Sequence, residues 1–422
     1  MQTQLAAFIR DTDAGQEADA ILRACVHCGF CTATCPTYQL LGDELDGPRG
    51  RIYQIKQVLE GQPATATVQR HLDRCLLCRN CETTCPSGVR YGDLLHIGRE
   101  VVERQVPRGF MGRVQQQAIL AVLPHANRFG PLLKIGQAFK PLLPAVLSRK
   151  IPPKRKAGAW PQPRHPRRMI ALDGCAQPSA APDTNPAAAR VLDRLGIALL
   201  RAPAAGCCGA AHHHTGDEPG GLVLARRNLD AWRPLIEAET GAGAEAIVMT
   251  ASGCGQHVKD YGRLLAHDPD YADLAQRVSA LTRDLSEILA NEDLTTLEPD
   301  TTRKVAFHPP CTLQHGQKLP GVVEGILDRL GFERVTIPDA HLCCGSAGTY
   351  SLLQPKLAMR LRDERLAALA TDAPDVIATA NIGCQLHLET GADVPVLHWI
   401  QLLDAPYNPL EVFGVMREME VE

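Results

Sequence analysis

The sequence predicts a multidomain α+β protein, in which a helical cysteine-rich domain precedes two repeated α/β domains with parallel sheets. Three observations lead to this fold class. The chain has 422 residues, which is long for a single core. Half of its 16 cysteines lie in two tight runs near the N-terminus. The other eight recur in a fixed pattern, within segments where short apolar runs alternate with longer helical patterns.

Four segments follow from this distribution. Residues 1–103 hold the two cysteine runs, and residues 104–166 form a basic linker. Residues 167–298 and 302–422 repeat one another, and each contains the sequence Cys-Cys-Gly. We call them the first and the second CCG copy.

The first segment is predicted to be helical. Between its cysteine runs lies GPRGRIYQIKQVLEG, in which Ile52, Ile55, Val58 and Leu59 share one face of a predicted helix. This pattern indicates a helical module rather than a compact β-rich one.

The two cysteine runs, CVHCGFCTATCP and CLLCRNCETTCP, share the spacing C-x2-C-x2-C-x3-C-P. This is the iron–sulfur run of two-cluster ferredoxins, in which the fourth cysteine serves the other cluster. Structural zinc sites also use C-x2-C pairs, but zinc does not require a four-cysteine run. We therefore expect two [4Fe-4S] clusters. Their ligands would be Cys25, Cys28, Cys31 and Cys85 for cluster 1, and Cys75, Cys78, Cys81 and Cys35 for cluster 2.

The basic linker contrasts sharply with the rest of the chain, whose formal net charge is −3 overall. From Arg104 to Arg168 there are fourteen lysines or arginines and no acidic residue. Its apolar pieces, QQQAILAVL and PLLKIGQAFKPLLPAVL, predict amphipathic helices that can lie on an anionic membrane surface. A solvated linker and a face that docks an acidic subunit are the alternatives. Nucleic-acid binding is not expected, because no recognised module accompanies the charge.

The repeat is visible in the cysteine spacing. Cys175 and Cys207 are 32 residues apart, as are Cys311 and Cys343, and the two pairs are offset by 136 residues. Each copy ends its cysteine pattern with C-x2-H, in GCGQH and GCQLH.

The CCG copies are predicted to be α/β units with the cysteines at one sheet edge. Apolar runs that read as strands alternate with helical patterns, which implies parallel strands whose carboxyl ends gather ligands. The predicted strands are 167–175, 196–203 and 244–254 in the first copy and 303–311, 334–338 and 375–384 in the second, and the predicted helices are 186–196, 222–238, 322–332 and 356–370.

Each CCG copy also has the donors for a metal site. The candidate ligands are Cys175, Cys207, Cys208, Cys254 and His257 in the first copy, and Cys311, Cys343, Cys344, Cys384 and His387 in the second. Three alternatives stay open: an iron–sulfur cluster in at least one copy, a zinc or other mononuclear site, and a redox-active or structural thiol set. Gly209 and Gly345 would permit a positive φ or a close backbone approach. The triplet of residues 212–214, three histidines, is expected in a solvated loop.

The N-terminus lacks a basic start and a sustained apolar core, so a secretory signal is not expected. No apolar run is long enough for a membrane span. We expect a cytoplasmic protein, peripheral on the inner membrane, whose thiols are metal ligands or redox groups rather than disulfides.

With both motif types in view, the chain resembles the iron–sulfur subunits of bacterial glycolate oxidase over nearly its whole length. The resemblance rests on the ferredoxin-type runs, the GPRGRIYQIK segment, both CCG copies and the HPPC and GCxxH elements. It implies a membrane-associated, FAD-linked 2-hydroxy-acid dehydrogenase, in which a separate FAD subunit oxidises glycolate. This subunit would then pass single electrons toward quinone, without oxidising substrate itself.

Related families keep alternatives open. Iron–sulfur subunits of lactate-utilisation and anaerobic glycerol-3-phosphate dehydrogenase systems share the layout, and the CCG subunit of heterodisulfide reductase is more distant. That last pattern ends in C-x2-C, whereas both copies here end in C-x2-H. The difference argues against a non-cubane cluster and thiol/disulfide reductase chemistry.

Overall fold

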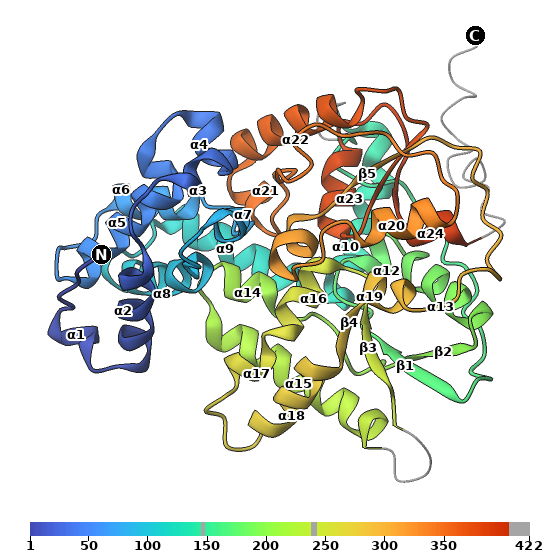
Figure 1. Ribbon diagram of the computed structural model, residues 1–422, viewed down its shortest axis with the longest axis horizontal. Helices are drawn as coiled ribbons and strands as arrows, with labels where there is room; N and C mark the ends of the chain where they lie inside the picture. The colour runs from blue at the N-terminus through green and yellow to red at the C-terminus, as the bar shows by residue number, and fades with distance from the viewer. Residues whose placement is uncertain (145–147, 238–242, 405–422) are drawn as a thin grey trace.

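The computed structural model describes residues 1–144, 148–237 and 243–404. Figure 1 shows a helical N-terminal part on one side of the molecule and the two α/β units on the other. The N-terminal part contains only helices and turns among its described residues. Its helices are α1 Ala7–Arg10, α2 Asp13–Ala24, α3 Phe30–Ala33, α4 Pro36–Leu41, the 3-10 turn η1 Glu44–Asp46, α5 Pro48–Leu59, α6 Ala66–Asp73, α7 Asn80–Thr84 and α8 Tyr91–Gln105.

Helix α5 forms the centre of this part. It packs against α8, and its predicted apolar face is buried, with Ile55 and Leu59 fully inaccessible to solvent. Pro48 begins the helix, where a missing N–H costs nothing. The helical module predicted from the stretch between the cysteine runs is confirmed.

The basic linker also forms helices. These are α9 Phe110–Val122, α10 Ala126–Phe139 and the 3-10 turn η2 Lys140–Leu142, and α10 packs against α12 Gln177–Ala180 of the first CCG copy. Part of the apolar piece that ends in PAVL lies outside the described residues. Among helices within the described ranges, none combines the length and hydropathy needed to cross a bilayer.

Each CCG copy contains a parallel sheet, as predicted. The order is β2-β1-β3-β4 in the first copy and β5-β6-β7 in the second. The strands are β1 Arg167–Ala171, β2 Ile197–Arg201, β3 Ala246–Met249, β4 Thr282–Asp284, β5 Val305–His308, β6 Val376–Thr379 and β7 Val396–His398.

Helices connect the strands in both copies. In the first copy they are α12, α13 Thr184–Arg194, α14 Ala210–His214, α15 Glu218–Ile236, α16 Ser252–Lys259, α17 Tyr261–Leu264, α18 Ala272–Leu281 and α19 Leu285–Ala290. In the second they are the π-helical turn η3 Thr312–Gly316, α20 Val322–Arg329, α21 Tyr350–Leu353, α22 Pro355–Leu369, α23 Ile382–Glu389 and α24 Ile400–Leu403.

The predicted strand at 334–338 is wrong. This segment makes only an isolated bridge between Arg334 and Val305. Pro338 has no amide hydrogen to donate to a neighbouring strand, and it restricts the backbone of the residue before it. The segment therefore does not continue as a strand. The second sheet therefore lacks the counterpart of β2, while β4 and β7, which the sequence did not predict, occupy matching edges.

Six of the eight CCG cysteines lie beyond the carboxyl ends of strands. Cys175 follows β1, the pair at 207–208 follows β2, Cys254 follows β3, and Cys311 and Cys384 follow β5 and β6. The pair at 343–344 follows the segment 334–338, which forms only an isolated bridge. The two copies share one apolar core, which includes Phe307 and Trp399 on the second copy's side. Both cysteine-bearing sheet edges are thus held by a common interior.

Candidate metal centres

Two cavities in the N-terminal part are lined by cysteines. Each contains three cysteines of one run and the fourth of the other, and Cys81 lines both. The first is lined by Cys35, Cys75, Cys78 and Cys81, and the second by Cys25, Cys28, Cys31, Cys81 and Cys85. The structure therefore brings Cys35 to the thiols of the second run and Cys85 to those of the first, and the two ligand sets stay a prediction.

The spacing of these thiols suits a cluster better than a single ion. Among the residues that the structure describes, no three of the eight gather within 4.8 Å of one another. Two zinc–sulfur bonds of about 2.3 Å cannot separate their sulfurs by more than about 4.6 Å. A cubane has four irons at separate positions, so it can bind thiols that lie farther apart than those around a single ion.

Burial makes these thiols poor anions unless a cation accompanies them. Burial raises the pKa of Cys31 to about 11, and it raises the pKa values of Cys78 and Cys81 well above that of a free thiol. Neighbouring thiols add to the effect in all three cases. Ligand thiolates at these positions therefore fit a group that brings its own positive charge, as iron does.

A buried arginine faces one of the cavities. Arg51 lines the cavity of Cys75, and its side chain is 1% exposed. Its guanidinium donates to the His71 carbonyl at 2.8 Å, to the Thr37 hydroxyl at 3.1 Å and to Asp46 at 3.4 Å. Burial opposes its charge, but Cys75 and other anionic neighbours raise the pKa of Arg51 overall. A permanent positive charge therefore lies beside this cysteine set.

The GPRGR sequence places a second arginine at the other cavity. Arg49 lines the cavity of Cys28 and pairs with Glu44 at 2.6 Å. Gly50 lies between the two arginines, and a Cβ there would overlap the Glu44 carbonyl oxygen. The glycine thus lets α5 begin close to η1, with one arginine directed to each cavity.

The CCG glycines have the predicted positive φ. Gly209 has φ of 95° and Gly345 has φ of 88°. The close approach is to protein backbone, since a Cβ would lie 2.7 Å from the Gly221 oxygen in the first copy and 2.6 Å from the Ala358 oxygen in the second. Each glycine therefore holds its cysteine pair against the helix that follows.

The cysteines of each CCG copy come together, although in different ways. In the first copy, hydrogen bonds from Cys175 and Cys208 lower the pKa of Cys207 well below that of a free thiol. In the second, the Cys311 and Cys343 sulfurs are 3.8 Å apart. Among the described residues, three donors within 4.8 Å occur in this region only in the second copy, where Cys344 and Cys384 are joined by a residue outside the expected set, His308.

The two C-x2-H histidines have protein partners. The His257 ring lies 5.4 Å from the His213 ring and 5.7 Å from the Tyr261 ring. His387 donates from Nε2 to the Ala358 carbonyl at 3.1 Å. Their places as ligands stay predictions.

The histidine triplet does not lie in a solvated loop. Residues 212–214 belong to α14, and the His213 ring packs 4.1 Å from the His96 ring of α8. Burial lowers the pKa of His213 to about 4 and of His214 to about 3. The helix carries these rings into the seam between the N-terminal part and the first CCG copy, a tertiary contact that local composition does not reveal.

The second CCG copy docks directly on one cysteine run. Cys78 packs against the apolar cluster that contains Cys311 and Cys343. Beside it, Asn80 donates to the His341 carbonyl at 3.0 Å, and Thr83 is 3.1 Å from the His315 ring nitrogen. One thiol of the first cavity is therefore next to the CCG thiols.

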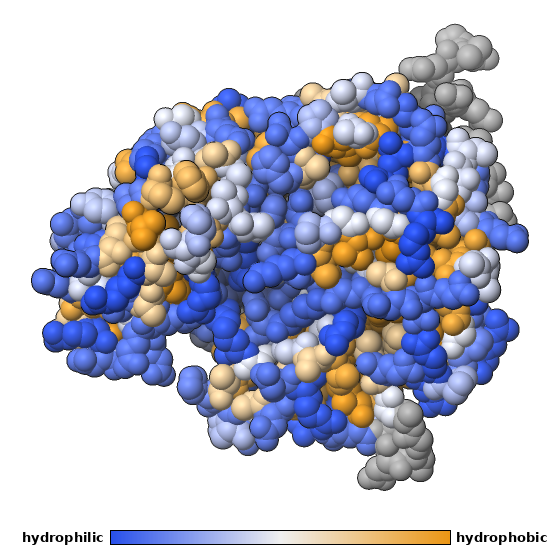
Figure 2. Space-filling model, viewed as in Figure 1, coloured by the Kyte–Doolittle hydropathy of each residue, from blue (hydrophilic) through white to orange (hydrophobic). Residues whose placement is uncertain are grey.

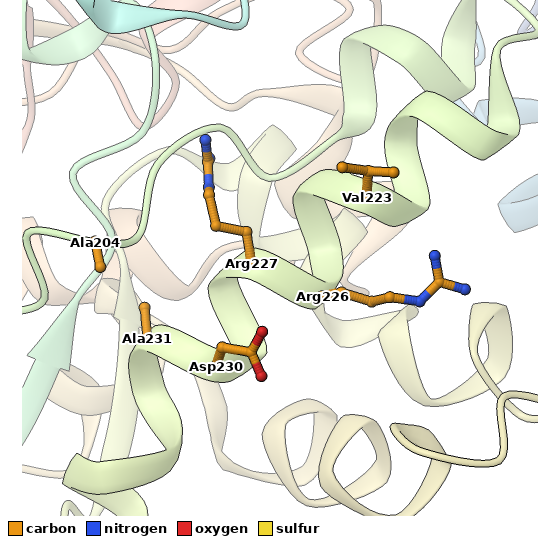
Figure 3. Close-up of a pocket in the computed structure, with 6 residues that line it drawn as sticks. All are labelled: Ala204, Val223, Arg226, Arg227, Asp230 and Ala231. Carbon is orange, nitrogen blue, oxygen red and sulfur yellow. The ribbon is translucent and has the colours of Figure 1, made fainter.

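Away from the cysteines, Figure 3 shows a hollow along α15, lined by Ala204, Val223, Arg226, Arg227, Asp230 and Ala231. Arg226 pairs with Asp268 at 2.6 Å, and Arg227 donates to the Cys207 carbonyl at 3.5 Å. No cysteine lines this hollow.

Comparisons with known proteins agree with this organisation. The 4Fe-4S dicluster domain family matches residues 21–89, and the cysteine-rich domain family matches residues 170–259 and 305–389. The glycolate oxidase iron–sulfur subunit of Escherichia coli (strain K12) is 56% identical over 405 residues, which cover 96% of this chain and 98% of that protein. The chain belongs to the glycolate oxidase iron–sulfur subunit family.

More distant members extend the family. The probable glycolate oxidase iron–sulfur subunit of Bacillus subtilis (strain 168) is 29% identical, over 87% of this chain and 88% of that protein. Lactate utilization protein A of Bacillus licheniformis is 28% identical, over 52% of this chain and 91% of its own length. The glycolate oxidase iron–sulfur subunits thus match the whole layout, and the lactate protein only part of it.

Proposed function

We propose that this chain is the electron-transfer subunit of an FAD-linked glycolate dehydrogenase complex. The observation that carries the proposal is the pair of cysteine cavities that share Cys81. Family membership supports glycolate as the complex's substrate, because the E. coli relative aligns along nearly its full length. Oxidation of glycolate is assigned to a separate FAD subunit.

The chain's residues would hold two [4Fe-4S] clusters in the ligand sets that line the cavities. Each bound cluster takes up and releases one electron at a time. The cysteines fix the two positions, and the buried Arg51 offsets negative charge at one of them. Cys81, between the cavities, gives a short protein path from one to the other.

The direct test is reduction by substrate. In the assembled complex under anaerobic conditions, glycolate is expected to produce the EPR signals of two reduced clusters, with about eight irons per chain from these sites. Dithionite reduction of the same sample measures the total reducible signal. Clusters that dithionite reduces but glycolate does not would contradict the electron-transfer role.

We further propose that the basic linker contacts an anionic membrane surface, where quinone can accept the electrons. Of the fourteen exposed large apolar side chains in the described part of the chain, seven lie between residues 110 and 142. Exposed apolar side chains are therefore concentrated in the linker. By contrast, the face of the molecule in Figure 2 is mostly hydrophilic, with small separate apolar patches. Exposed apolar side chains among lysines and arginines suit lipid headgroups and the acyl boundary.

Helix α10 provides the test of this contact. Leu132, Ile135 and Phe139 are 52%, 55% and 56% exposed and fall on one helical face. Replacing all three with serine is expected to lower binding to phosphatidylglycerol vesicles at least about tenfold, because buried apolar area is lost. Sedimentation with vesicles measures the bound fraction. The Val223→Ser variant, which removes an exposed apolar side chain outside the linker, should bind as the parent does; equal binding by the triple variant would sink the proposal.

A further inference from the structure

A buried histidine of the second CCG copy has no hydrogen-bond partner. His308, the last residue of β5, is inaccessible to solvent, and both of its ring nitrogens lack partners among the described residues. One of these nitrogens lies with the Cys344 and Cys384 sulfurs in a group whose donor atoms are all within 4.8 Å. A buried ring nitrogen without a partner is costly, and three such donors together suit a metal.

A buried arginine nearby also has hydrogen-bond partners for only part of its guanidinium group. Arg365 on α22 is 3% exposed and donates from Nη1 to the Asp339 carbonyl at 2.7 Å. Its Nε and Nη2 have no partner among the described residues, and no carboxylate pairs with it there. Burial lowers the pKa of Arg365, and the groups that act against this are the thiol of Cys344, the Asp339 carboxylate, and the thiols of Cys343 and Cys384. A buried guanidinium with free N–H groups toward thiols calls for an anionic group at the site.

The first CCG copy provides an internal comparison. At the 136-residue offset between the copies, His308 corresponds to Leu172. On the helix after each CCG, the contacts Gly209–Gly221 and Gly345–Ala358 set an offset of 137 residues, so Arg365 corresponds to Asn228. Leu172 is buried in the apolar core of the first copy, and Asn228 is a buried neutral amide that donates to the Cys207 carbonyl at 3.0 Å. The first copy therefore lacks the unpartnered histidine and the buried cation, although its cysteines have the same spacing.

The donor set of the second copy exceeds what one zinc ion uses. Four cysteines and His308 gather at this sheet edge, and the Cys311 and Cys343 sulfurs are 3.8 Å apart. Structural zinc takes four ligands, one fewer than the five donors that gather here. Several thiolates with bridging sulfide are anionic, which matches Arg365.

We propose that the second CCG copy, and not the first, holds an iron–sulfur centre with His308 as a ligand beside Cys344 and Cys384, and Arg365 as its counter-charge. The inference deepens the electron-transfer function and rests on it for the centre's role. Because Cys78 packs against the cluster of Cys311 and Cys343, the centre adjoins cluster 2 and extends the path by one step.

The test is metal analysis of the full chain, purified anaerobically, with iron, zinc and acid-labile sulfide measured beside EPR. The parent protein is expected to contain clearly more than the about eight irons of two cubanes. His308→Leu and Arg365→Asn, which install the first copy's residues, should each lose that excess and its EPR signal. The signals of the two ferredoxin-type clusters should remain.

A further variant keeps the test decisive if one of these misfolds. His308→Cys should retain the excess iron with an altered EPR signal, since a thiolate replaces the imidazole. The proposal is overturned by about eight irons with one zinc, or by excess iron that survives His308→Leu. Glycolate that fails to reduce the two cubanes would instead refute the electron-transfer function, whatever the iron count.

Discussion

Replacing Cys81 with serine is expected to lower quinone reduction by the assembled complex at least about a hundredfold, while glycolate still reduces the flavin of the partner subunit at its normal rate. Cys81 lines both cysteine cavities, so its loss affects the ligand set of cluster 2 and the shortest protein connection to cluster 1. Iron should fall by about four per chain. Anaerobic stopped-flow absorbance follows the flavin, and a soluble quinone analogue reports onward transfer in the same preparation.

The matched control is Cys175→Ser, the same chemical change in the first CCG copy. Cys175 lies beyond β1 and lines neither cavity. This variant is expected to reduce quinone as the parent does. Loss of flavin reduction in Cys81→Ser, with the complex still assembled by gel filtration, would contradict a role in electron transfer alone.

The cysteine sets could be predicted because their geometry is largely local. Within each run the cysteines are separated by two or three residues, and the proline after the fourth one turns the chain toward the other run. The exchange of Cys35 and Cys85 between cavities follows from that spacing. The α/β organisation of the copies was equally readable, since buried parallel strands appear as continuous apolar runs.

The residues that the sequence did not reveal act through tertiary contacts. His308 precedes Cys344 by 36 residues, and Arg365 reaches the same place from a different helix. No local sequence pattern marks either residue. The one signal in the sequence is for His308: the second copy has HPPC where the first has LDGC at the corresponding positions of the repeat. The short strands β4 and β7 were missed because three residues are too few to show a period of two.

With the centre proposed above, the two CCG copies would share a fold without sharing a site. Their cysteine spacing reflects the common sheet edge, where Cys175 and Cys311 lie beyond the ends of β1 and β5. The buried side chains differ, because the second copy has His308 and Arg365 where the first has Leu172 and the neutral Asn228. In this arrangement the second copy lies next to the proposed electron path, and the first copy completes the apolar core that both share.

The two arginines of GPRGR give a matched pair for separating charge from fold. Arg51→Met removes one of three partners of the buried Asp46, which keeps Arg74 at 2.8 Å and His71 at 3.0 Å, so the expected cost is about 1–3 kcal/mol. Arg49→Met removes a pair with Glu44 whose side chains are 33% and 40% exposed, which costs at most about 1 kcal/mol. Anaerobic urea unfolding measures both, and equal losses would contradict the burial argument.

The same pair also tests the electrostatic role at the clusters. Arg51 lies permanently charged beside Cys75, so its removal makes an added electron less favourable and should shift the reduction potential of cluster 2 to a more negative value. Arg49→Met should shift cluster 1 less, because its guanidinium is partly exposed and screened by solvent. EPR-monitored redox titration of the folded variants resolves the two clusters. An unchanged potential for cluster 2 would show that Arg51 serves the fold alone.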